Sequence, residues 1–202
     1  MDVIEYVNKS FGLYFGDKES YSYIDKNTTW QNAFFVSVGF SFFVSLIAIF
    51  VEYTYTTNPN FLIENFISLL IATAILLPIT IFIMYGLIYF ILKLFGGKAD
   101  YFNTLRFGVS ISMFTTLLIG LFNMIPSRFF STELNYTLDL IYVVIILAMV
   151  IWTYVVFVKV YSRLHELSEG RTAVALLIPL LIMFVLALII FLLFFLFLGA
   201  SF

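Results

Sequence analysis

The chain has 202 residues, of which 63% are hydrophobic and 11% are charged, and its mean hydropathy is +1.09. Soluble domains carry about 25% charged residues, so this composition indicates an integral membrane protein. The net charge of -2 and the lack of a basic stripe argue against a nucleic-acid partner. The absence of Cys excludes disulfides, thiolate nucleophiles and thiolate metal ligands.

Residues 1–29 form a polar N-terminal tail. They contain eight charged residues and no continuous apolar stretch, so we do not expect a cleavable signal peptide. If the first half of the tail is helical, one face carries Val3, Ile4, Val7, Phe11 and Tyr14. This pattern predicts a short cytosolic tail with an amphipathic helix in the membrane interface. Two glycines at 12 and 16 disfavour the helix.

Five apolar runs follow the tail. A hydrocarbon core of about 30 Å needs roughly 20 apolar residues in a helix, and each run reaches this length. The predicted spans are 31–51, 65–92, 107–126, 136–158 and 173–202. The sequence therefore predicts an all-α fold, a polytopic membrane helix bundle of five transmembrane helices within residues 30–202.

The distribution of Lys and Arg sets the orientation of the bundle. Three basic residues lie in the tail, three between the second and third spans and three between the fourth and fifth, while Arg128 stands apart. Five spans place these groups on one side, which the positive-inside rule makes cytosolic, with the carboxyl terminus extracytosolic. Splitting the second run at Pro78 would move six basic residues outside. We therefore expect Pro78 to kink one helix, with Thr73 or Thr80 satisfying the freed carbonyl.

Small residues recur every four positions in two of the spans. The first span carries Ala33, Ser37, Ser41 and Ser45, and the third carries Thr104, Gly108, Ser112, Thr116 and Gly120. Each set falls on one helix face, and small residues let helix backbones approach closely in lipid. We expect both seams to be packing surfaces, against each other or against other helices. The alternative is a polar-lined conduit, which is not required because the hydroxyls can bond their own backbone.

The polar segment 159–173 holds the only His of the chain, His165. A lone His cannot form a two-histidine metal site, and the neighbouring Ser and Glu residues match no catalytic motif. We interpret the segment as a turn, with Ser168 as a helix N-cap and Gly170 relieving the backbone. Gly96 and Gly97 are expected to end the second span, because the spacing of a phosphate loop is missing. The sequence predicts no catalytic residue, no cofactor and no metal.

Acidic residues gather on the predicted extracytosolic side, at Glu52, Glu64, Glu133 and Asp139. Glu64 and Asp139 lie near the starts of the second and fourth spans, where a charge is usually paired, solvated or functional. A small-solute or ion transporter with a cation or proton entry site is therefore the alternative function. The opposing explanation is that acids remain where the positive-inside rule removes bases, with Arg128 pairing to Asp139 or Glu133. The lack of a charge near the middle of any span favours this explanation.

Two segments at span boundaries carry a family resemblance. LKLFGGKADYFNTLRFG, at 92–108, joins the second and third spans. WTYVVFVKVYSRLHELSEGRTAVALLIPLL, at 152–181, joins the fourth and fifth and contains the pattern H-x-L-S-x-G-R-x-A, formed by His165, Leu167, Ser168, Gly170, Arg171 and Ala173. Both segments resemble the Yip domain, the Ypt/Rab-interacting-protein family of five-span membrane proteins, over roughly residues 30–200.

The resemblance implies a membrane adaptor or scaffold rather than an enzyme. Eukaryotic members lie in early secretory and Golgi membranes, associate with one another and engage Rab-type GTPases. The short tail here lacks their D-L-Y-G-P-like motif, and GVSISMF at 108–114 lacks their Tyr and Pro. The chain is therefore more similar to prokaryotic members, and a Rab-type partner is not favoured.

The expected partners are the lipid bilayer, a second copy of the chain or other membrane proteins. The expected location is the plasma membrane of a prokaryote or the secretory endomembranes of a eukaryote. Basic loop residues can bind anionic headgroups or a cytosolic partner. The residues expected to make these contacts are Lys98, Arg106, Arg163, His165 and Arg171.

Overall fold

The computed structural model describes residues 2–54, 60–123 and 135–199. These residues form helices and no strand, which confirms the all-α fold. The elements are α1 (Val3–Tyr14), α2 (Lys18–Asn27), α3 (Trp30–Tyr53), α4 (Phe61–Ile71), the π-helical segment η1 (Ala72–Leu76), α5 (Leu77–Leu94), α6 (Tyr101–Asn123), α7 (Asn135–His165) and α8 (Glu169–Gly199).

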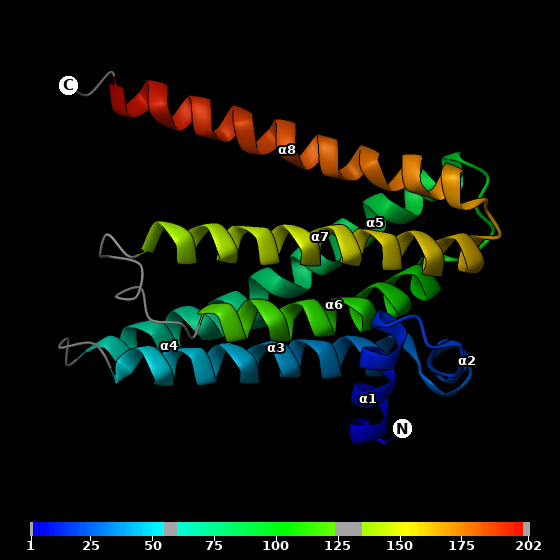
Figure 1. The fold of residues 1–202 in the computed structure, drawn as a ribbon, viewed down its shortest axis with the longest axis horizontal. Coiled ribbons are helices and arrows are strands. Elements are labelled where there is room, and N and C mark those ends of the chain that lie inside the picture. Colours follow the sequence, from blue (N-terminus) through cyan, green and yellow to red (C-terminus); the bar gives the residue numbers. More distant parts are fainter. Residues whose placement is uncertain (1, 55–59, 124–134, 200–202) are drawn as a thin grey trace.

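Long helical rods alternate in direction along the bundle: α3, the continuous α4–η1–α5, α6, α7 and α8 (Figure 1). Among the described residues, four stretches are long and apolar enough to span a membrane: Trp30–Tyr53, Phe61–Leu94, Tyr101–Leu121 and Leu140–His165. These match the first four predicted spans. The fifth falls largely on α8, and the five-span count and the orientation in the membrane stay predictions.

Helices α6 and α7 extend well beyond the predicted spans. Asp100 caps the start of α6, where its carboxylate accepts the backbone N–H of Asn103 at 2.8 Å and the side-chain amide of Asn103 at 2.7 Å. At the other boundary, α7 continues past Lys159 to His165. Apolar length predicts only the part of a helix that lies in hydrocarbon, so these polar extensions escape it.

The second rod passes Pro78 as one helix, as predicted. The π-helical segment η1 ends two residues before Pro78, and the Leu77 N–H bonds the Ala72 carbonyl. The Thr73 hydroxyl donates to the Leu69 carbonyl at 2.7 Å, whereas Thr80 is exposed. A π turn, rather than a Thr80 hydroxyl, therefore accommodates Pro78. The rod of 34 residues is about 51 Å long and runs obliquely in Figure 1.

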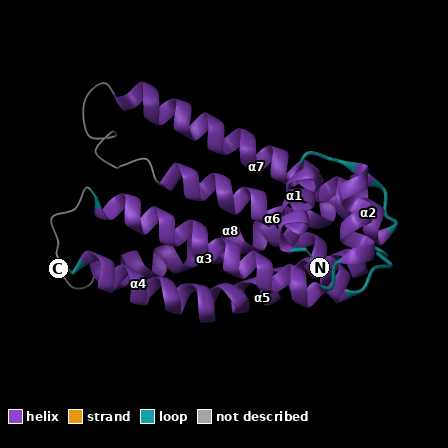
Figure 2. Ribbon diagram, turned by 90° about the horizontal axis from the view of Figure 1, so that it is seen from below, coloured by secondary structure: helices purple, strands orange, loops and turns teal. Residues whose placement is uncertain are grey.

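Helices α1 and α2 form a unit that we name the N-terminal cap. The cap lies at the end of the bundle where α3, α6 and α8 begin, beside the loops of α5–α6 and α7–α8 (Figure 2). Its first helix lies across the rods rather than along them (Figure 1). The cap docks through buried side chains, Tyr6, Leu13, Tyr14 and Ile24. The docking of these side chains determines which residues of the tail are buried and which stay exposed.

The predicted apolar face of α1 is only partly correct. Phe11 and Tyr14 pack against the core, but Val3 and Ile4 are 52% and 74% exposed. The docked face is centred on Tyr6 instead, because its hydroxyl bonds Ser110 of α6 at 2.8 Å and thereby sets the rotation of the helix. Whether the exposed end of α1 enters the membrane interface stays a prediction.

Candidate functional site

Basic residues gather at the end of the bundle that carries the N-terminal cap, which we name the basic end. They come from the cap, from the α5–α6 connection and from the ends of α5, α6, α7 and α8. They are Lys9, Lys18, Lys26, Lys93, Lys98, Arg106, Lys159, Arg163 and Arg171. Arg128 lies outside the described residues. The candidate site is this basic end together with the polar contacts that hold it.

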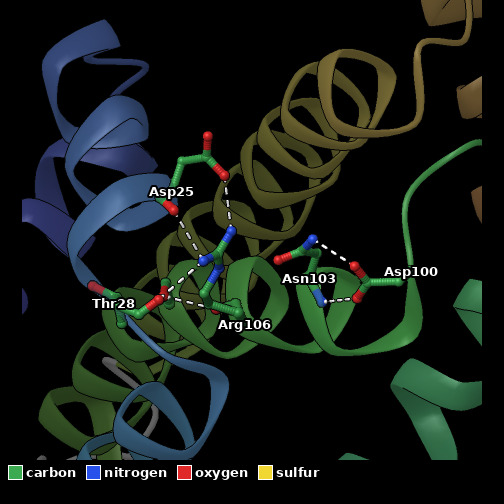
Figure 3. Close-up of polar contacts among 6 residues, drawn as sticks. Asp25, Thr28, Asp100, Asn103 and Arg106 are labelled. Carbon is green, nitrogen blue, oxygen red and sulfur yellow. Dashed lines mark hydrogen bonds and ion pairs between the residues drawn. The ribbon is translucent and has the colours of Figure 1, made fainter.

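Arg106 of α6 ties the cap to the bundle (Figure 3). Its Nη1 donates to the carbonyls of Asp25 at 3.0 Å and Thr28 at 2.9 Å, and its Nη2 pairs with the Asp25 carboxylate at 2.8 Å. The guanidinium is buried, whereas the Asp25 side chain is half exposed. A planar group with several donors can satisfy two carbonyls and a carboxylate at once, which an ammonium cannot do. Arg106 therefore fixes the end of α2 and the start of α3 against α6.

Arg106, which the sequence suggested as a contact for a partner or a lipid headgroup, is buried and bonds the cap, and its contact with a partner or lipid stays a prediction. Its Nη1 and Nη2 groups bond residues that lie 78 and 81 positions away, whereas its buried Nε has no hydrogen-bond partner among the described residues. The sequence showed a basic loop residue but not these partners, because carbonyl acceptors have no signature in the sequence. Arg106 is a structural residue of the basic end.

His165 is fully buried at the end of α7. Its Nε2 lies 2.9 Å from the Thr104 hydroxyl, which itself donates to the Asp100 carbonyl at 2.9 Å. Because the single hydroxyl proton of Thr104 is used there, His165 Nε2 must donate, and the neutral ring carries its lone pair on Nδ1. The ring thus contacts the start of α6 in this structure, and the partner contact through His165 stays a prediction.

The α5–α6 loop closes over His165. Gly96 has φ +93° and ends α5, with the Gly97 N–H bonding the Leu92 carbonyl at 2.9 Å, as the predicted helix end requires. A β-carbon on Gly97 would meet His165 Nδ1. Beyond it, the Lys98 N–H donates to the His165 carbonyl at 3.0 Å. The two segments that carry the family resemblance are thus bonded to each other.

The turn between α7 and α8 differs in one detail from the prediction. Ser168 is the N-cap, with its hydroxyl accepting the Arg171 N–H at 3.4 Å. The left-handed residue, however, is Glu166 at φ 53°, whereas Gly170 lies within α8. Glu166 also pairs with Lys98 at 2.6 Å, and this hydrogen bond raises the pKa of the Lys98 ammonium above its usual value.

Three of the predicted contact residues remain exposed: Lys98, Arg163 and Arg171. Lys98 shares its charge with Glu166, and the Arg163 guanidinium lies 4.0 Å from the centre of the Tyr21 ring of the cap. The contact of Tyr21 with Arg163 and the ion pair of Lys98 with Glu166 bring the cap, the α5–α6 loop and the α7–α8 turn together into one surface. Their contact with a partner or lipid stays a prediction.

The small-residue seams of α3 and α6 meet over only part of their length. Ser37 donates to the Val109 carbonyl at 3.4 Å, and Ser45 shares a shallow hollow with Gly120, whose missing β-carbon leaves room for Val44. Gly108 instead faces the rings of Tyr85 and Tyr161, which come from α5 and α7. The seams therefore serve three helix contacts rather than one.

Between these helix contacts, the small-residue seams line a cavity. Ser37, Ser41, Ser112 and Thr116 lie on the wall of a space of about 350 Å³ among α3, α5, α6, α7 and α8. The Tyr85 hydroxyl, also on this wall, bonds the Ser112 hydroxyl at 2.7 Å. Packing and an internal space thus coexist on the same residues, which the spacing alone could not show.

The acids that motivated the transport alternative do not form a site among the described residues. Glu64 is exposed in the first turn of α4, and no group of three potential metal ligands occurs in the described parts of the chain. The Arg128 and Glu133 residues, and the side chain of Asp139, lie outside the description. The predicted pairing of Arg128 with Asp139 or Glu133 therefore stays a prediction.

A comparison with family models places the chain. The model of the Yip1 domain matches residues 11–200. The chain belongs to the Yip1-domain family. This match confirms the suspected family and covers both the cap, from Phe11 onward, and the bundle, so this Yip1-domain protein is a helical integral membrane protein. Searches of the curated proteins and of the solved structures find no match.

Proposed function

We propose that this Yip1-domain protein is a non-enzymatic membrane adaptor or scaffold whose basic end binds other membrane or cytosolic proteins and anionic lipid. The observation that carries the proposal is the attachment of the cap by Arg106, which builds one surface from the tail and both basic loops. A preformed surface binds without the entropic cost of ordering its loops. The cap and loops face the cytosol in this proposal, as the positive-inside rule favours.

The proposed contacts are electrostatic and centre on Lys98, Arg163 and Arg171. Each basic residue near an anionic membrane surface contributes about 1 kcal/mol of attraction. The same charges suit an acidic face of a membrane partner, including a second copy of the chain. The proposal does not include a Rab-type GTPase, and it includes no catalytic turnover.

Crosslinking in native membranes, followed by purification and native mass spectrometry, tests the adaptor function. We expect a defined complex with protein or anionic lipid that is lost when Lys98, Arg163 and Arg171 are all replaced by Ala. The matched control replaces three other exposed bases of the same end, Lys18, Lys26 and Lys159. Complexes that survive the first triple variant, or a monomer without any co-purifying protein or lipid, would overturn the proposal.

Transport of a small solute or ion is the second candidate, because a cavity with hydroxyls on its wall lies inside the bundle. Against it, the rings of Tyr85 and Tyr161 fill the space beside Gly108 toward the basic end. Liposome flux distinguishes the two functions. Flux that disappears in Asp139→Asn or Glu64→Gln would support the transport function. The absence of flux in the wild-type protein would support the adaptor function.

A further inference from the structure

The cavity is predominantly apolar in character despite its hydroxyl groups. The Tyr85 hydroxyl is paired with Ser112 at 2.7 Å, and the Tyr154 hydroxyl donates to the Ala173 carbonyl at 2.5 Å. The rest of the wall is chiefly Leu, Ile, Met, Val, Phe and Pro. A polar solute would lose its water here and gain few hydrogen bonds, which is unfavourable. The chemistry of the wall therefore favours hydrocarbon.

The opening of the cavity lies deep in the bundle. Thr80 of α5 and Leu180 of α8 both line the cavity and are both exposed, so we place the opening between them. Along the helix axis, Thr80 lies about 29 Å from one end of the Phe61–Leu94 rod and about 21 Å from the other. The opening is therefore near the middle of the bilayer, whichever end of the bundle is cytosolic.

Only the bilayer interior can supply an occupant at this depth. The surface on both sides of the opening is apolar and exposed, with Ile79 and Ile83 on α5 and Leu177 and Leu181 on α8. Toward the basic end, Tyr85 and Tyr161 pack against Gly108 and restrict the space. An apolar space that opens into hydrocarbon suits the end of a hydrocarbon chain rather than a polar solute.

We propose that the cavity binds one acyl chain of a bilayer lipid, which enters between α5 and α8. A volume of about 350 Å³ is within the usual range of small-molecule sites. Met84 and Met113 on its wall are unbranched and can adapt to a flexible chain. This site is separate from the basic end, so the proposal stands or fails independently of the adaptor function.

Photolabelling tests the site. The full-length protein is placed in nanodiscs that contain a phosphatidylcholine with a diazirine at the end of one acyl chain, and the labelled residues are mapped by mass spectrometry. We expect labels on Met84 and Met113. Because Phe at the opening would displace several methylenes, Thr80→Phe should lower this labelling about tenfold. The matched control is Ile79→Phe, which adds the same ring at a neighbouring exposed position outside the cavity and should leave labelling unchanged.

A second pair, Leu180→Phe with the control Leu181→Phe, repeats the test from α8. Labelling of Met84 and Met113 that is unchanged in both opening variants, or wild-type labels confined to exposed residues, would overturn the proposal. The Cys-free chain also permits a Ser41→Cys variant. If Ser41→Cys reacts with a water-soluble maleimide as fast as Lys18→Cys does, the space is filled with water and the proposal is overturned. A much slower reaction of Ser41→Cys would support the proposal. The wild-type and Ser41→Cys results decide the matter even if the opening variants fail to fold.

Discussion

Gly97 lies directly against the imidazole of His165, so closely that no β-carbon fits between them. A β-carbon at Gly97 would also meet the Leu92 carbonyl, which is backbone and cannot turn away. Gly97→Ala should therefore force the α5–α6 loop away from α7 and lower the stability by about 1–3 kcal/mol. Thermal unfolding in detergent micelles measures this loss.

Gly39→Ala is the matched control for this prediction, because Gly39 lies in α3 with nothing within 4 Å of its β-carbon position. Ala is the better helix former, so this variant should be as stable as the wild type or more stable. A Gly97→Ala protein that unfolds at the wild-type temperature would contradict the close packing against His165.

Replacement of Arg106 should release the N-terminal cap. Arg106→Ala leaves the Asp25 and Thr28 carbonyls without their donors, at a cost of about 1–3 kcal/mol, and Arg106→Lys should restore only part of it. Hydrogen exchange should therefore accelerate throughout residues 3–27 in both variants. Arg171→Ala, which removes an exposed charge of the same basic end, is the control and should keep wild-type exchange in the cap.

The sequence predicted those features that depend on residues close together in the chain. Apolar length located the rods, and local chemistry located the end of α5 at Gly96 and the cap of α8 at Ser168, because both depend on neighbours within a few residues. The burial of Arg106 and His165 depends on partners 61 or more positions away, to which no local pattern points. The cavity could not be predicted for the same reason. The spacing of Ser and Gly places them on one helix face but does not show which helices lie opposite that face.

The contact of Tyr6 with Ser110 should be the main polar bond between α1 and α6. Ser110 donates its own proton to the Arg106 carbonyl at 2.8 Å, so Tyr6 is the donor to Ser110. Burial raises the pKa of the Tyr6 phenol, which keeps it protonated. Tyr6→Phe should cost about 1–2 kcal/mol of stability in chemical unfolding.

A double-mutant cycle with Ser110→Ala checks this assignment. The two changes should be less than additive, because each removes the same bond. Tyr23→Phe is the control, since its hydroxyl bonds an exposed Glu5 carboxylate at 3.2 Å and should contribute little. Fully additive effects of Tyr6→Phe and Ser110→Ala would show that the bond does not couple the two helices.

Acid should loosen the start of α2 through Asp17. Its carboxylate accepts the Ser20 hydroxyl at 2.5 Å and the Ser20 and Glu19 N–H groups at 3.0 and 3.2 Å, and these bonds lower its pKa. The resulting stability is present above the unfolded pKa of about 3.9 and is lost as pH falls through the lower folded pKa. Asp17→Asn keeps a cap without the titration, so its unfolding temperature should fall less than that of the wild type between pH 5 and pH 3. Equal acid sensitivity in the two proteins would exclude Asp17 as a source of the effect.

The turn that joins α7 to α8 should tolerate, and gain from, a glycine at Glu166. The left-handed backbone of Glu166 closes the turn through the bond from the Leu167 N–H to the Ser162 carbonyl at 3.0 Å. A side chain costs about 1–2 kcal/mol in this conformation, which Gly avoids, whereas the exposed pair with Lys98 contributes little. Glu166→Gly should therefore raise the unfolding temperature, and Glu166→Gln, which removes the charge but keeps the strain, should leave it nearly unchanged. If Glu166→Gly unfolds earlier than Glu166→Gln, the side chain at this position stabilises the turn by more than the strain it imposes.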